Sequence, residues 1–339
     1  MRAGVALLGI FCLVMPSLAS PSDRSPREIY DALNALRIDP TSTYPIQATD
    51  RIELHRADLK LSFEEGKLAF FKAFDGRITG AVFSGRGHAL ALPRGIVEKQ
   101  QMARFLGAPV LDQDFGYVAM RFTDTSADDL LREFAAAKLQ PQQDSEFASQ
   151  WDPLLASSNP LHSLRIALDS LTKDPRPYFY ATVGGIATGP FDAVLDLARY
   201  EPFLLGQPKR SGLREFYDVW ASCQVPDVSQ PRPAFRALQY AVDTSLLPDG
   251  PLDAKSDIRF RAEAAGEQLL VFQLSRSLVV DSVTSDRGER LTYFQNEGMN
   301  LQERNLRGND YLYVALPAAP AVGAEFTCLL YTSPSPRDS

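Results

Sequence analysis

The sequence predicts a β-rich α+β protein: an antiparallel meander domain with peripheral helices, followed by an incomplete β-sandwich. Three observations favour this fold class. Short runs with period-two alternation dominate the chain, glycine-containing turn signals separate them, and only a few segments show helical spacing. The 339 residues are enough for about two domains.

Composition and charge exclude several classes of protein. Hydrophobic residues make up 45% and charged residues 23%, which is typical of a globular chain. Basic residues number 35 against 42 acidic ones, and no block rich in Lys or Arg occurs, so a general nucleic-acid-binding role is disfavoured. The only long apolar run lies at the extreme N-terminus, which argues against a multi-spanning membrane protein.

Residues 1–19 have the layout of a secretory signal peptide. Arg2 supplies a positive charge, residues 5–18 are largely apolar, and Ser17 and Ala19 are small residues before a cleavage site. An uncleaved anchor is the alternative, but the run is shorter than the roughly 20 residues that a bilayer core requires. We therefore expect an exported protein, periplasmic or secreted, with no transmembrane span after cleavage.

Residues 26–240 are expected to form a β-rich α+β domain of unknown role. Ser25, Pro26 and Glu28 form a capping box, which predicts a helix over 26–37. From residue 46 to 123 the pattern changes to a meander of short strands, with a further helix expected over 98–106.

Specific turn and cap signals divide this meander. Residues 64–67 and 85–87 are interpreted as turns, and Asp75-Gly76 is a strong hairpin signal. Ser126 is expected to cap the next helix.

The segment after Pro141 is harder to assign. Residues 178–183 are expected to form a strand, whereas two sets of apolar residues at helical spacing suggest two helices. The first set is Phe191, Val194, Leu195 and Ala198, and the second is Leu213, Phe216, Tyr217 and Trp220. Residues 226–233 contain three prolines and are the best candidate for a linker.

Residues 243–327 show strand-like runs separated by glycines, which suggests a β-sandwich. The final twelve residues, 328–339 (CLLYTSPSPRDS), do not continue that pattern. Reverse translation makes them compatible with the transposase adapter used to prepare sequencing libraries. We therefore expect an adapter-like artefact that adds no packing, a β-domain cut near Thr327, and residues 312–326 on an edge whose neighbour is missing.

Metal-binding and catalytic motifs are weak in this chain. The three histidines, His55, His88 and His162, are far apart in sequence, whereas zinc ligands are typically closely spaced. A single cysteine, Cys223, remains once the signal and the tail are removed, so no intrachain disulfide is expected.

Other short motifs favour structural roles. Residues 170–173 match S-x-x-K, but the supporting S-D-N and K-T-G elements are absent, so Ser170 is better explained by a helix end. The glycine pairs at 85–87 and 182–185 are interpreted as turns, and the acidic pairs Glu64-Glu65 and Asp128-Asp129 as a turn and the start of a helix. We assign no catalytic, cofactor-binding or metal-ligating residue.

A family resemblance begins after residue 243. Residues 269–283 (LLVFQLSRSLVVDSV) contain an F-x-L strand followed by V-x-S-V. Residues 288–291 (GERL), 312–317 (LYVALP) and 323–326 (GAEF) continue the pattern. This stretch resembles the opening strands of the N-terminal β-domain of zinc aminopeptidases of the aminopeptidase N type. Residues 74–85 resemble, more loosely, an extra exported domain that precedes such peptidases in some environmental bacteria.

The resemblance implies peptide hydrolysis by a zinc domain downstream of this chain, with H-E-x-x-H ligands and a G-x-M-E-N segment for the substrate amine. Residues 297–300 only superficially match G-x-M-E-N and lack its glutamate after Met299. The resemblance therefore places no cofactor in this chain, zinc in the downstream domain, and a peptide as the substrate of the full-length protein. The alternative is a secreted β-rich binding or scaffolding module without peptidase activity. A serine hydrolase built around Ser170 is a remote third possibility.

Overall fold

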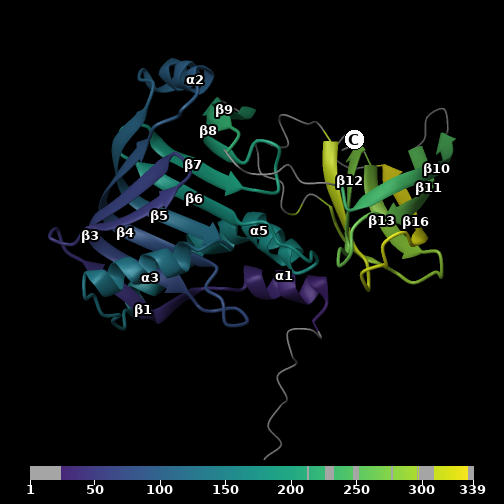
Figure 1. The fold of residues 1–339 in the computed structure, drawn as a ribbon, viewed down its shortest axis with the longest axis horizontal. Coiled ribbons are helices and arrows are strands. Elements are labelled where there is room, and N and C mark those ends of the chain that lie inside the picture. The colour runs from purple at the N-terminus through teal and green to yellow at the C-terminus, as the bar shows by residue number, and fades with distance from the viewer. Residues whose placement is uncertain are drawn as a thin grey trace, which may run out of the picture.

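The computed structural model describes residues 24–211, 214–225, 233–246, 252–275, 278–295, 297 and 309–334. The expected signal peptide, most of the proline-rich segment 226–233, and residues 335–339 lie outside this range. Within it, the prediction of a β-rich α+β fold is confirmed: antiparallel sheets dominate and a few helices pack against them (Figure 1).

A nine-stranded antiparallel sheet forms the first half of the molecule. Its order is β1-β3-β4-β5-β6-β7-β8-β9, and β2 pairs with β3. The strands are β1 (Ile38–Ile46), β2 (Ile52–Arg56), β3 (Leu59–Phe71), β4 (Gly80–Ala91), β5 (Leu111–Phe122), β6 (Tyr178–Gly185), β7 (Gly189–Asp196), β8 (Phe203–Ser211) and β9 (Arg214–Cys223).

Among the described residues, five helices accompany this sheet: α1 (Pro26–Asn34), α2 (Ile96–Leu106), α3 (Ser126–Ala136), α4 (Ser145–Gln150) and α5 (Asp152–Asp169). Side chains of α2 and α3 join an aromatic core on one face of the sheet, where Met102 and Phe134 are buried with Phe63, Phe83 and Phe115. Helices α1, α4 and α5 contribute to the cores on the other face. Both faces of the sheet are therefore covered.

The predicted helices over 26–37 and 98–106 are present as α1 and α2, with slightly different ends. The capping box of α1 is complete, because the Ser25 side chain accepts from the Glu28 backbone and the Glu28 carboxylate accepts from the Ser25 backbone. Ser126, however, is not the cap of α3. Thr125 precedes that helix, and the Ser126 hydroxyl instead contacts Arg56 and Asp124.

Two turns predicted at 64–67 and 85–87 are wrong, because β3 and β4 run through them. Gly66 and Gly85 face each other across the two strands, with φ of 151° and 148°. A Cβ on either glycine would collide with the backbone of the opposite strand. The two glycines therefore allow the backbones of β3 and β4 to approach closely, and both strands continue through this point.

The two helices predicted from Phe191 and from Leu213 are also wrong. Residues 189–196 and 214–223 form β7 and β9, and Leu213 itself lies outside the described residues. Both strands carry apolar side chains toward both covered faces, so the period-two alternation that marks a half-exposed strand is lost. The predicted strand over 178–183 is confirmed as β6.

A β-sandwich forms the second half of the molecule. A four-stranded sheet has the order β10-β11-β16-β13, and a three-stranded sheet has the order β12-β15-β14. The strands are β10 (Phe235–Leu246), β11 (Leu252–Ala262), β12 (Leu269–Ser275), β13 (Leu278–Ser285), β14 (Thr292–Gln295), β15 (Asn309–Ala315) and β16 (Glu325–Pro334). Side chains from both sheets form one core, which includes Ile258, Leu270, Val283 and Leu312.

The expectations of a missing neighbour and of a tail without packing are both wrong for the described residues. Strand β15 lies between β12 and β14, and β16 lies between β11 and β13. Residues 328–334 of the tail belong to β16, where Cys328, Leu330 and Thr332 are buried. These residues alternate inward and outward as a strand requires, so the segment fits the sandwich whatever its origin.

Helix α1 joins the two halves. The Arg27 guanidinium lies 4.1 Å from the ring centroid of Phe294, donates to the Tyr293 carbonyl at 2.9 Å, and pairs with Glu297 at 2.8 Å. Tyr30 packs edge-on against Phe294. The sheet and the sandwich therefore share one buried apolar cluster around α1 and α5.

Candidate functional site

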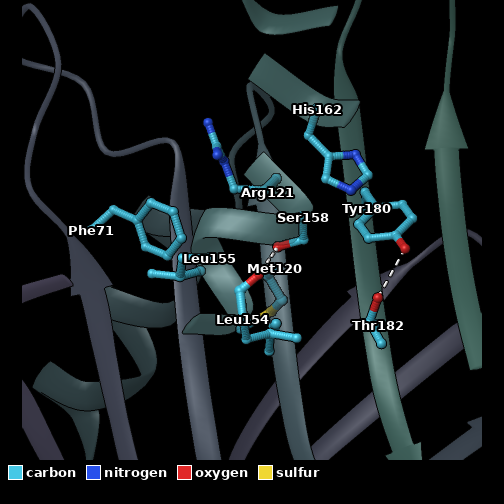
Figure 2. Close-up of a pocket in the computed structure, with 10 residues that line it drawn as sticks. Phe71, Met120, Arg121, Leu154, Leu155, Ser158, His162, Tyr180 and Thr182 are labelled. Carbon is cyan, nitrogen blue, oxygen red and sulfur yellow. Dashed lines mark hydrogen bonds between the residues drawn. The ribbon is translucent and has the colours of Figure 1, made fainter. Parts of the chain in front are cut away.

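A small cavity lies between α5 and the large sheet (Figure 2). Its volume is about 20 Å³, which is room for about one water molecule. The lining is apolar at β3 and at the start of α5, and it is polar further along α5 and at β6. The lining residues are Phe71, Ala119, Met120, Arg121, Leu154, Leu155, Ser158, His162, Tyr180 and Thr182.

His162 on α5 is a titratable group that this environment alters strongly. Its Nδ1 lies 2.7 Å from the Tyr178 hydroxyl, and its ring packs on Tyr180 with centroids 3.8 Å apart. Its Nε2 is buried and has no hydrogen-bond partner among the described residues. Burial, assisted by the positive charge of Arg121, lowers the pKa of His162 to about 3, so the imidazole is neutral at physiological pH.

Arg121 on β5 supports the opposite wall of the cavity. It is 4% exposed, its Nε donates to the Thr79 carbonyl at 3.2 Å, and its guanidinium lies 5.1 Å from the Phe71 ring centroid. Burial lowers the pKa of Arg121 to about 10, which still leaves it charged at neutral pH. Arg121 therefore forms part of the cavity wall, and its positive charge disfavours protonation of His162.

A carboxylate surrounded by hydroxyl groups lies beside the polar end of the cavity. Asp192 on β7 accepts from the Tyr180 hydroxyl at 2.7 Å, from the Thr182 hydroxyl at 3.0 Å and from the Tyr217 hydroxyl at 3.1 Å. We call these four residues the Asp192 cluster. The pairing of Thr182 with Asp192 across β6 and β7 brings two of them together, and β9 contributes Tyr217.

The electrostatics of the Asp192 cluster are unusual. Within the described part of the chain, no Lys, Arg or His side chain forms an ion pair with Asp192. Burial raises the pKa of Asp192, although the three hydroxyl hydrogen bonds oppose the shift. Burial and the charge of Asp192 raise the pKa of Tyr180 and of Tyr217, so both phenols remain protonated donors.

The cluster lies beneath the molecular surface. Its four residues keep only a small part of their surface exposed, and burial is the main cause of the pKa shifts of Asp192, Tyr180 and Tyr217. Gly206 lies beneath the Tyr217 ring, where a Cβ would collide with that ring. The Tyr217 ring therefore packs directly on the β8 backbone opposite Asp192.

A second carboxylate on β7 has different partners. Asp196 is 3% exposed and accepts from Arg165 at 3.0 Å and from Arg199 at 3.2 Å, while Arg165 also pairs with Asp169. Burial alone would raise the pKa of Asp196, but the charges of Arg165 and Arg199 lower it below its ordinary value. These contacts tie the end of α5 to the end of β7.

The structure does not bring the three histidines into one site. His55 on β2 lies 3.2 Å from Glu53, and His162 is buried on α5. His88 on β4 lies between two carboxylates of β5, with Asp112 and Asp114 each at 2.9 Å. Sequence reasoning missed this arrangement, because it depends on the register between β4 and β5.

The remaining motifs occupy structural positions. Ser170 is the C-cap of α5, and its hydroxyl donates to the Ala167 carbonyl at 2.6 Å, which agrees with the helix-end interpretation. Burial alone would raise the pKa of Asp129. Hydrogen bonds from Thr125, Arg56 and Arg132 outweigh burial and lower this pKa below its ordinary value.

The acidic pair Glu64-Glu65 forms ion pairs with Arg86 across the strands, at 3.1 and 3.4 Å. Of the residues that superficially match G-x-M-E-N, Glu297 pairs with Arg27. Met299 and Asn300 lie outside the described residues.

The described residues contain no group of three or more His, Cys, Asp or Glu side chains placed to hold a metal ion. None of the helices in the same ranges is long and apolar enough to cross a membrane. No family model matches the sequence, and no curated protein matches it.

Proposed function

We propose that the chain is the N-terminal, non-catalytic part of an exported zinc aminopeptidase-like protein. The observation that supports this proposal is the fold of the segment with the family resemblance. Residues 269–275 form β12, residues 278–283 fall on β13, and residues 312–316 fall on or just after β15. These strands contribute to a single sandwich core, as a β-domain of that family requires.

In this proposal the first half of the molecule acts as a scaffold for the sandwich. Arg27 and Tyr30 contact Phe294 of the sandwich, and the Gln268 backbone donates to the Leu171 carbonyl at 2.9 Å. A buried contact of this kind would hold the sandwich in one orientation and so position a peptidase domain attached to it.

The second candidate is an exported β-rich binding module with no peptidase domain. The observation that favours it is the Asp192 cluster, in which a carboxylate and three hydroxyl groups converge without an internal cation among the described residues. Groups with altered pKa values are common at functional sites.

Sequencing the source DNA beyond the codon for Thr327 separates the two candidates. The first predicts an H-E-x-x-H motif within the next few hundred codons. The protein encoded by that longer gene should then bind one zinc ion per chain and release amino acids from aminoacyl reporter substrates. A stop codon soon after Thr327 would refute the first candidate and leave the binding module.

A further inference from the structure

We propose that the free edge of β10 is a contact surface for a second copy of this chain. Within the described residues, β10 is the last strand of the four-stranded sheet and pairs only with β11. Every second residue of an edge strand directs its backbone N–H and C=O groups away from the neighbouring strand, where another strand can pair with them. The proposal depends on neither of the two proposed functions.

The first argument concerns two apolar side chains of β10 that the sandwich leaves uncovered. Tyr240 lies opposite Ile258 of β11, and Ile258 lies opposite Cys328 of β16, so the three side chains share the inner face of the sheet. Ile258 and Cys328 are buried in the sandwich core, whereas Tyr240 is 60% exposed. Val242 lies on the same face of β10 and is 59% exposed. The apolar inner face of the sheet therefore extends beyond the part that the core buries.

The second argument concerns the features that normally keep an edge strand from pairing. Such strands usually carry prolines, β-bulges or charged side chains that point inward. Residues 239–245 (QYAVDTS) contain no proline, and their register with β11 is continuous; the irregularity of β10 precedes them, between Ala237 and Gln239. Their single charged residue, Asp243, points to the outer face and lies opposite Lys255 of β11. This segment is therefore suited to accept a further strand.

The third argument concerns self-complementarity. Two antiparallel copies of β10, related by a two-fold axis perpendicular to the sheet, keep their apolar side chains on one face. With the axis at Ala241, Tyr240 of each copy lies opposite Val242 of the other, and Gln239 lies opposite Asp243. The first is an aromatic–β-branched pair, which stabilises adjacent strands, and the second places an amide donor beside a carboxylate acceptor. An axis at Asp243 would instead place two like charges opposite each other, which is destabilising.

The partner that fits this edge is therefore a second β10, and the two four-stranded sheets then form one continuous sheet. The test measures the mass of the whole chain in solution by sedimentation equilibrium at pH 7. We expect the average mass to rise from that of one chain toward that of two as the concentration increases from about 1 µM to about 500 µM, because a small interface binds weakly.

Substitutions at the two apolar positions should weaken this association. Tyr240→Lys and Val242→Glu each place a charge opposite an apolar side chain of the other copy, so each should raise the dissociation constant at least about tenfold. Val271→Lys is the matched control. Val271 is a valine of similar exposure, 54%, on β12 of the other sheet, so the dissociation constant should not change.

An equimolar mixture of the Tyr240→Lys and Val242→Glu chains tests the register. In a mixed dimer the two introduced charges are opposite in sign and face each other, while one Tyr240–Val242 pair is kept. The mixture should therefore associate at least about fivefold more tightly than either variant alone. The proposal is refuted if the unmodified chain stays monomeric up to about 500 µM. It is also refuted if the mass rises past that of two chains, if either variant associates as the unmodified chain does, or if mixing the variants restores nothing.

Discussion

Asp192 and Asp196 lie on the same strand and point to the same face of the large sheet, but their partners differ completely. Asp196 pairs with Arg165 and Arg199, whereas Asp192 accepts hydrogen bonds from Tyr180, Thr182 and Tyr217. The pKa of Asp196 is lowered and that of Asp192 is raised. Two carboxylates four residues apart on one strand therefore differ: folding stabilises Asp196 as an anion and destabilises Asp192 as an anion.

This difference distinguishes a structural site from a candidate binding site. The folded protein stabilises the charge of Asp196 with its own arginines, so an external ligand has nothing to add there. At Asp192 the fold supplies donors but no opposite charge within the described residues, which leaves an interaction for a ligand to make. Substitutions at either carboxylate, or at the partners of one of them, perturb one side of this comparison at a time.

The largest effect is expected at Arg165. Arg165→Met keeps the length of the side chain but leaves Asp169 and Asp196 without their shared guanidinium. Removing one partner of a buried ion pair typically costs about 3–5 kcal/mol of unfolding free energy. Urea unfolding at pH 7 measures the loss. Arg132→Met is the control, because the pair that Arg132 makes with Asp129 is 72% exposed on the arginine side, and it should cost less than about 1 kcal/mol.

The next largest effect is the pH dependence of the unfolding free energy that His162 causes. The pKa of His162 is about 3 in the folded state and about 6.5 when unfolded, so only the unfolded state gains its proton as pH falls between these values. The contribution of neutral His162 to the unfolding free energy is fully present above about pH 6.5. It falls by about 1.4 kcal/mol per pH unit below that pH.

Urea unfolding at pH 7 and pH 5 tests this effect. His162→Phe should lose about 2 kcal/mol less between the two pH values than the unmodified chain does. His55→Gln changes an exposed histidine and should retain the original pH dependence. An identical pH dependence in His162→Phe and the unmodified chain would mean that His162 is not held neutral by the fold.

The smallest effect is expected at Tyr217. Tyr217→Phe removes one hydrogen bond to Asp192 and should lower the unfolding free energy by about 1 kcal/mol at pH 7. In an Asp192→Asn background the same change should cost less, because the acceptor is no longer charged. Tyr240→Phe, at a tyrosine that is 60% exposed, should cost nothing measurable by urea unfolding. Equal losses in the two backgrounds would show that Tyr217 does not act through Asp192.

Local signals in the sequence were sufficient for the first elements of the fold. The capping box at Ser25 and Glu28 identifies α1, because its hydrogen bonds are made within one helical turn. The strand β7 was mistaken for a helix because Phe191, Ala193 and Val194 are all buried, so apolar residues do not alternate there. The glycines Gly66 and Gly85 were interpreted as turns because their closeness across two strands is not visible in the sequence.

The candidate site could not be predicted for a related reason. Tyr180 and Thr182 are separated by one residue, which could have suggested that they share a face of β6. Their contact with Asp192 depends on the register between β6 and β7, and Tyr217 arrives from β9. Long-range pairing of strands creates the site, and no local motif encodes it.

The most direct test of the comparison measures Asp192→Asn and Asp196→Asn side by side. Both changes remove one charge and keep the shape of the side chain. At pH 7 we predict that Asp196→Asn lowers the unfolding free energy by about 3 kcal/mol or more, because Arg165 and Arg199 lose their shared anion. Asp192→Asn should leave stability within about 1 kcal/mol of the original or raise it, since a carboxylate whose pKa is raised by folding opposes folding when it is ionised. Equal and large losses in the two variants would contradict the account.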